Sequence, residues 1–152
     1  MNQINSILLV CIGNICRSPY AEIKLKELMK LSKQKIYQIE SAGIHAMVND
    51  PAHFYSIKVA KENNLNLKNH TAKQVTIEFV KKYDLILVME EEQKKWIEKK
   101  FPFSKGKVHL IGKWRNLIID DPYDKPYESY VEMAKNIDAC LADWIQKIEL
   151  KN

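Results

Sequence analysis

The chain has 152 residues, 46% of them hydrophobic, which suits a single domain spanning residues 1–152 around one core. Its net charge of +5 comes from lysines spread along the sequence, typical of a solvated surface, so we expect no nucleic-acid partner. Three irregularly spaced cysteines, no basic signal region and a first apolar run too short for a membrane span predict a cytoplasmic protein without membrane insertion.

Short apolar runs alternate with longer helical patterns along the chain, which indicates βα units around a parallel sheet. Strands are predicted at residues 5–10, 36–41, 84–89 and 107–111. Helices are predicted at residues 18–32, 51–63, 74–82, 91–100 and 127–148. We therefore expect an α/β fold, a single-domain doubly wound sheet of four parallel strands with helices on both faces. The irregular stretch 112–126 is a candidate functional loop.

The turn after the first predicted strand begins at the thiol of Cys11 and ends at the guanidinium of Arg17. Arginine is scarce here, because only Arg17 and Arg115 among the 24 basic residues are arginine. Its planar fork suits two-pronged recognition of oxyanions, and its positive field would favour the thiolate form of Cys11 at neutral pH. The pair predicts a nucleophile that handles phosphate. A buried, inert cysteine beside a surface arginine is the structural alternative, and the combination with strand before and helix after argues against it.

A phosphate-binding loop is predicted between the first strand and the first helix, where open α/β sheets bind ligands. Ser18 is a suitable N-cap and Pro19 a suitable first helical residue, so the helix would direct free N–H groups into the loop. Gly13 and Asn14 tolerate backbone conformations that let the loop curl around an anion. The predicted phosphate-binding residues are Ile12, Gly13, Asn14, Ile15, Cys16, Arg17 and Ser18.

The segment 10–22, VCIGNICRSPYAE, resembles the signature of the low-molecular-weight protein tyrosine phosphatases. Further similarities, covering nearly the whole chain in order, are Ser41-Ala42-Gly43, His70-Thr71-Ala72-Lys73-Gln74, residues 84–89 and Asp121-Pro122-Tyr123. The stretch 111–114 with residues 121–125 resembles the bacterial branch that acts beside capsule and exopolysaccharide tyrosine autokinases. The resemblance implies a phosphotyrosine phosphatase with no cofactor, whose partners are phosphotyrosine proteins, above all such an autokinase.

The resemblance implies a covalent mechanism with Cys11 as nucleophile, Arg17 as phosphate clamp and Asp121 as general acid. A tyrosyl leaving group needs a proton, because a phenol of pKa about 10 departs poorly as phenolate. Asp120 is a chemically credible rival that the sequence leaves open. No metal site is predicted, since the four histidines form no HExxH motif and no CxxC pair is present.

By the same resemblance, Ser18 would hydrogen-bond the Cys11 sulfur, and Ser41 and His70 would hold Asn14 in the loop. Cys16 is either a reversible disulfide partner of Cys11 under oxidants or a passive small residue. Cys140, in the last helix, is expected in the core.

Substrate choice would come from a deep pocket with apolar walls, for which the candidates are Ile12, Ile15, Met47 and Tyr123. Ile15 matches tyrosine-specific members, whereas related arginine-phosphate phosphatases resemble Thr at that position. Two departures from the animal members are Asp124, in place of a second tyrosine, and Met47, in place of a large aromatic.

Three alternative functions would also use a phosphate-binding loop. An arsenate reductase of the same fold needs a further cysteine pair downstream, and no cysteine lies between Cys16 and Cys140. A phosphoarginine phosphatase is disfavoured by Ile15. A non-enzymatic phosphate- or nucleic-acid-binding module would not need both the thiol and the acid.

Overall fold

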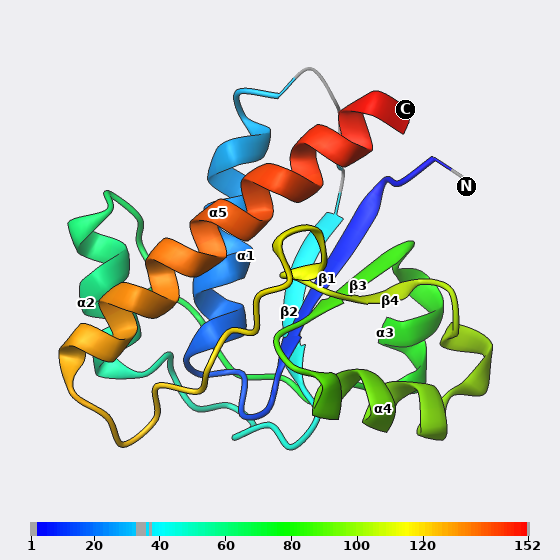
Figure 1. Ribbon diagram of the computed structural model, residues 1–152. Helices are drawn as coiled ribbons and strands as arrows, with labels where there is room; N and C mark the ends of the chain where they lie inside the picture. Colours follow the sequence, from blue (N-terminus) through cyan, green and yellow to red (C-terminus); the bar gives the residue numbers. More distant parts are fainter. Residues whose placement is uncertain (1–2, 33–35, 37, 152) are drawn as a thin grey trace.

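The computed structural model describes residues 3–32, 36 and 38–151, and its centre is one parallel β-sheet (Figure 1). The strands are β1 (Ser6–Cys11), β2 (Gln38–Gly43), β3 (Leu85–Val88) and β4 (Val108–Leu110). They lie in the order β2-β1-β3-β4, and every neighbouring pair is parallel. The predicted α/β fold is confirmed.

Helices cover both faces of the sheet, as a doubly wound fold requires. The helices α1 (Arg17–Met29), α2 (Phe54–Glu62) and α5 (Tyr127–Lys151) lie on one face, and α3 (Ile77–Lys82) and α4 (Glu91–Lys100) lie on the other (Figure 1). Two short 3₁₀ turns, Pro102–Ser104 and Lys113–Arg115, flank β4.

The central strand β1 supplies both hydrophobic cores because successive side chains of a strand point to opposite faces. Ile7 and Leu9 belong to the core under α1 and α5, whereas Leu8 and Val10 belong to the core under α3 and α4. All six residues of β1 are buried. A strand buried on both faces reads as a continuous apolar run, which is why the sequence located it well.

Several element boundaries differ from the prediction, for local reasons. The second strand runs over Gln38–Gly43 rather than 36–41, and residue 37 of the predicted range lies outside the described residues. Helix α2 begins at Phe54 rather than at residue 51, because the His53 side chain caps it by accepting from the Tyr55 N–H. Helix α3 begins at Ile77 because the Thr76 hydroxyl accepts from the N–H of Phe79.

The first helix also differs from its predicted range of 18–32. It begins at Arg17 and ends at Met29, and Lys30 and Leu31 form a turn. The prediction that Ser18 is the N-cap was wrong: Cys16 precedes the helix without any side-chain cap, and the Ser18 hydroxyl is used elsewhere.

The topology brings two distant segments together at the carboxyl ends of the strands. Strand β1 ends at Cys11, and the chain enters α1 six residues later. The stretch from residue 112 to residue 126 passes beside this loop on its way to α5, and the Ile119 carbonyl accepts a hydrogen bond from Arg17. Within the described ranges, no helix has the length and apolar character needed to cross a bilayer.

Candidate active site

The loop between β1 and α1 has an unusual hydrogen-bond arrangement, because six consecutive carbonyl oxygens, from Cys11 to Cys16, accept hydrogen bonds from outside the loop. The donors are the backbone N–H groups of Ile44, His45, Met47 and His53, Nε2 of His70 and the hydroxyl of Ser56. With the carbonyls held outward, the peptide N–H groups are left for the inner side of the turn. Such a nest, at the N-terminus of a helix, is suited to bind an anion.

Asn14 is the turning point of this loop. It has a φ of 60° and is fully buried. Its Nδ2 donates to Ser18 Oγ at 2.8 Å and to Ser41 Oγ at 3.0 Å, while its Oδ1 accepts from the Lys73 N–H at 2.8 Å. His70 Nε2 donates to the Asn14 carbonyl at 2.7 Å, and burial lowers the pKa of His70. The structure thus brings Ser41 and His70 to Asn14.

The glycine that the loop requires is not the one within it. Gly13 lies outside the left-handed region, so the expectation that its backbone freedom shapes the loop was wrong. Gly43, at the end of β2, is required instead, because a Cβ there would lie 2.3 Å from the Ile12 carbonyl oxygen. The close approach of β2 lets residues 44–47 donate to the loop carbonyls. Sequence reasoning noted Gly43 only as part of a motif.

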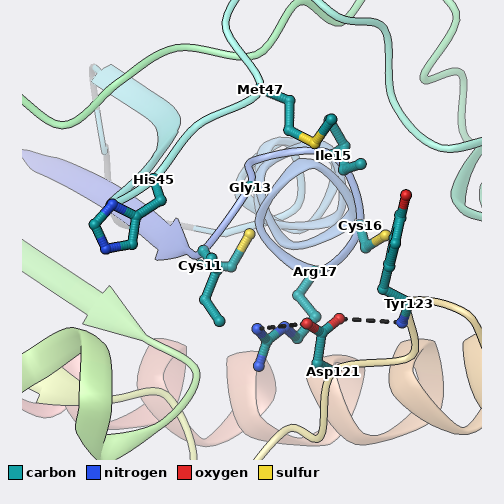
Figure 2. Close-up of a pocket in the computed structure, with 10 residues that line it drawn as sticks. Cys11, Gly13, Ile15, Cys16, Arg17, His45, Met47, Asp121 and Tyr123 are labelled. Carbon is teal, nitrogen blue, oxygen red and sulfur yellow. Dashed lines mark hydrogen bonds and ion pairs between the residues drawn. The ribbon is translucent and has the colours of Figure 1, made fainter.

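The two cysteines of the loop differ in environment. Cys11 Sγ lies 2.9 Å from Ser18 Oγ and borders the pocket (Figure 2). Cys16 Sγ lies 3.5 Å from the Tyr130 hydroxyl, and burial raises the pKa of the Cys16 thiol to about 12. Cys16 is therefore a protonated thiol at neutral pH. Cys140, on α5, is buried in the core on the α1 and α5 side of the sheet, as expected.

Arg17 is buried, with only 1% of its side chain exposed, and its position is fixed by oxygens from two other segments. One terminal nitrogen donates to Glu90 Oε1 at 2.5 Å and to the Ile119 carbonyl at 2.8 Å. The other lies 3.7 Å from Asp121 Oδ2. Its Nε is buried and has no hydrogen-bond partner among the described residues, so it is an available donor for a bound oxyanion.

The two aspartates of the stretch 112–126, the late loop, occupy different places. Asp121 lines the pocket that also contains Cys11 and Arg17, and its Oδ1 accepts from the Tyr123 N–H at 3.1 Å (Figure 2). Asp120 does not line that pocket; it borders a separate depression against α5. Of the two carboxylates, only Asp121 therefore faces the Cys11 side of the loop.

The predicted wall residues all line this pocket. In Figure 2, Ile15 and Met47 lie on the side of Cys11 opposite Arg17 and Asp121, and Tyr123 closes one end. Ile12 also contributes to the wall. The resulting cleft is an apolar slot above a polar base, a shape suited to a flat aromatic phosphate.

Two residues of the site escaped the sequence analysis. His45 lines the pocket, and Glu90 accepts from Arg17. Glu90 also forms a reciprocal capping box with Gln93 at the start of α4. The capping pattern is readable in the sequence, but the contact with Arg17 spans 73 residues and has no local signal.

Comparison with known proteins agrees with this geometry. Residues 6–152 match the family model described as "Low molecular weight phosphotyrosine protein phosphatase". The chain belongs to the low-molecular-weight protein tyrosine phosphatases. It is 39% identical to the phosphatase Ptp of Acinetobacter johnsonii over 146 residues, covering 96% of this chain and 99% of the relative.

Two further relatives are bacterial phosphatases that share the name Wzb. The phosphatase Wzb of Escherichia coli K12 is 38% identical over 147 residues, covering 96% of this chain and 97% of the relative. The structure of Vibrio vulnificus Wzb in complex with benzylphosphonate superposes with a TM-score of 0.87 at 37% identity, covering 95% and 99% of the two chains. The protein is thus a phosphatase of phosphotyrosine, a hydrolase.

Replacing Asn14 by Ala should destabilise the protein far more than backbone strain alone. Asn64 has a similar φ of 62° but is exposed, so Asn64→Ala is a matched control that tests only the strain, about 1 kcal/mol. Asn14→Ala also leaves buried partners unsatisfied, at about 1–3 kcal/mol each. We expect its free energy of unfolding, measured with denaturant, to fall by at least about 3 kcal/mol. Equal losses in the two variants would contradict the assigned network.

Proposed function

We propose that this phosphatase hydrolyses phosphotyrosine through a cysteinyl-phosphate intermediate on Cys11, with Arg17 as phosphate clamp and Asp121 as general acid and base. The single observation that carries the proposal is the position of Cys11 at the base of the loop whose six carbonyls are all held outward. Asp121, lining the same pocket, completes the pair of groups that the reaction needs.

In the first step, the Cys11 thiolate attacks phosphorus, and the bond from phosphorus to the tyrosyl oxygen breaks. Asp121, in its acid form, gives its proton to that oxygen, so tyrosine leaves neutral. The loop N–H groups and Arg17 match the charge spread over the three remaining oxygens of the transferring phosphoryl group.

In the second step, water attacks the phosphorus of the cysteinyl phosphate, and the bond from phosphorus to sulfur breaks. Asp121, now a carboxylate, takes the proton from the water, and Cys11 leaves as a thiolate. The Ser18 hydroxyl, 2.9 Å from the sulfur, donates to the departing thiolate and so makes it a better leaving group. Each step of this mechanism is carried out by side chains and backbone N–H groups of the chain, so none requires a metal or cofactor.

The apolar walls favour phosphotyrosine over the other phosphorylated residues. A phosphoserine is too short to reach a sulfur at the base of the slot, whereas a flat ring fits between Ile15, Met47 and Tyr123. Ile15 also provides no hydroxyl for a guanidinium, which disfavours phosphoarginine. The absence of any cysteine between Cys16 and Cys140 in the sequence disfavours arsenate reduction, which needs a disulfide relay.

We further propose that the physiological substrate is a bacterial tyrosine autokinase that acts in polysaccharide production. Support comes from the similarity to Wzb at 38% identity and from the motifs at residues 111–114 and 121–125. The cytoplasm is the compartment that suits this task, since the three cysteines are free and a catalytic thiolate needs a reducing environment. We propose that residues 1–152 form one domain with this function.

Substrate class is tested with peptides carrying phosphotyrosine, phosphoarginine or phosphoserine, assayed by phosphate release without added metal. We expect hydrolysis of the phosphotyrosine peptide, with rates on the other two at least about a hundredfold lower. Cys11→Ser should abolish turnover while keeping the fold. The control variant Cys140→Ser, in the core, should keep its activity. Preference for phosphoarginine, or activity in Cys11→Ser, would refute the proposal.

The choice of acid is tested by a matched pair of neighbouring substitutions. Asp121→Asn should lower kcat on a phosphotyrosine peptide by about 10²–10⁴-fold without weakening the binding of inorganic phosphate, because the amide keeps the acceptor for the Tyr123 N–H but cannot transfer a proton. Asp120→Asn should change kcat less than about threefold, since Asp120 faces away from the pocket. A larger loss in Asp120→Asn would make Asp120 the acid.

A further inference from the structure

His53 stands at a junction between the phosphate loop, helix α2 and the late loop. Its backbone N–H donates to the Ile15 carbonyl at 2.7 Å, so the main chain here is part of the loop's outer support. Its Nδ1 accepts from the Tyr55 N–H at 3.0 Å and caps α2. With one ring nitrogen and the backbone both engaged, the orientation of the imidazole is fixed.

The fixed imidazole contacts the pocket wall. The His53 ring lies parallel to the buried ring of Tyr130, with centroids 5.0 Å apart and an interplanar angle of 17°. It meets Tyr123 edge to face, with centroids 5.9 Å apart and an angle of 75°. Among the described residues, His53 is the only aromatic residue whose ring contacts Tyr123.

Among the described residues, no hydrogen bond holds the Tyr123 side chain, so the His53 ring is its contact of defined geometry. It belongs to an exposed loop, and 46% of its surface is accessible. Its backbone N–H is bound to Asp121, which fixes the main chain but not the ring. Ordering a mobile Tyr123 ring on binding would cost free energy and weaken the affinity for the ligand. A ring that is already held in place carries no such cost.

We propose that the imidazole of His53 is a positioning residue that holds Tyr123 against the pocket and thereby sets the affinity for aryl phosphates. The inference rests on the proposed function, in which Tyr123 is a wall for the substrate ring. Burial lowers the pKa of His53 despite the nearby charge of Asp124, which agrees with a neutral ring whose Nδ1 accepts a hydrogen bond. Replacing the His53 side chain should leave binding of the phosphate group unchanged. The backbone N–H that donates to the Ile15 carbonyl remains in every substitution other than proline.

Two substitutions separate the ring from the cap. His53→Asn keeps a side-chain acceptor for the N-terminus of α2 and removes the ring. His53→Phe keeps a ring and removes the acceptor. Phe54→Ala is the matched control, since the Phe54 ring is 68% exposed and contacts Tyr55 but not Tyr123.

The measured quantities are the inhibition constants of phenylphosphonate and of inorganic phosphate, together with kcat on p-nitrophenyl phosphate. His53→Asn should weaken phenylphosphonate binding about three- to tenfold, the range expected for one aromatic pair, and change phosphate binding and kcat less than twofold. His53→Phe should bind phenylphosphonate within twofold of the parent because it keeps a ring. Its melting temperature should fall because the N-cap acceptor of α2 is lost. Phe54→Ala should match the parent in all three quantities.

Tyr123→Ala, alone and combined with His53→Asn, separates this inference from the proposed function. We expect the double variant to bind phenylphosphonate no more weakly than Tyr123→Ala, because His53 acts through Tyr123. If Tyr123→Ala leaves phenylphosphonate binding unchanged, the wall assignment fails, and the inference fails with it. If Tyr123→Ala weakens binding but His53→Asn does not, or weakens phosphate equally, only the positioning by His53 is refuted.

Discussion

The outward fixation of six successive carbonyls, from Cys11 to Cys16, is the constraint on which the rest of the site depends. A short loop cannot direct its N–H groups at one anion unless its carbonyls are satisfied elsewhere, since an unpaired buried carbonyl is costly. Here the chain from residue 44 to residue 56, with His70, supplies all six donors. The loop that we propose as the phosphate cradle is therefore shaped by contacts on its outer side.

The same contacts that hold β1, β2 and the segment after β2 together also shape the proposed anion site. The parallel pairing of β1 with β2 brings Gly43 beside Cys11, and the absence of a side chain there lets the following segment reach the loop. Asn14 then reverses the chain with its side chain bound on both sides. On the other face of the site, Arg17 is held by Glu90 and Ile119, so the guanidinium is placed before any ligand arrives.

The sequence predicted the features that are encoded locally. The buried strands appear as apolar runs, the helices as periodic patterns, and the thiol, arginine and acid as motifs that resemble a known family. It failed on one of two roles expected of Ser18: the hydroxyl does not cap the helix, but it lies against the Cys11 sulfur as the resemblance implied, and it also accepts from Asn14. It also missed Glu90 and the ring of His53, whose partners are 73 and 70 residues away in the chain. Such contacts have no periodicity to read.

The N–H groups that the outward carbonyls leave free are expected to bind a phosphate group over the Cys11 sulfur. The test is the rate of Cys11 alkylation by iodoacetamide at pH 7 with increasing inorganic phosphate, with Cys11→Ser as the blank. We expect phosphate to slow the alkylation of Cys11 with the same concentration dependence as its inhibition of p-nitrophenyl phosphate hydrolysis. Alkylation that stays unchanged at inhibitory phosphate concentrations would refute the assignment of this loop as the phosphate site.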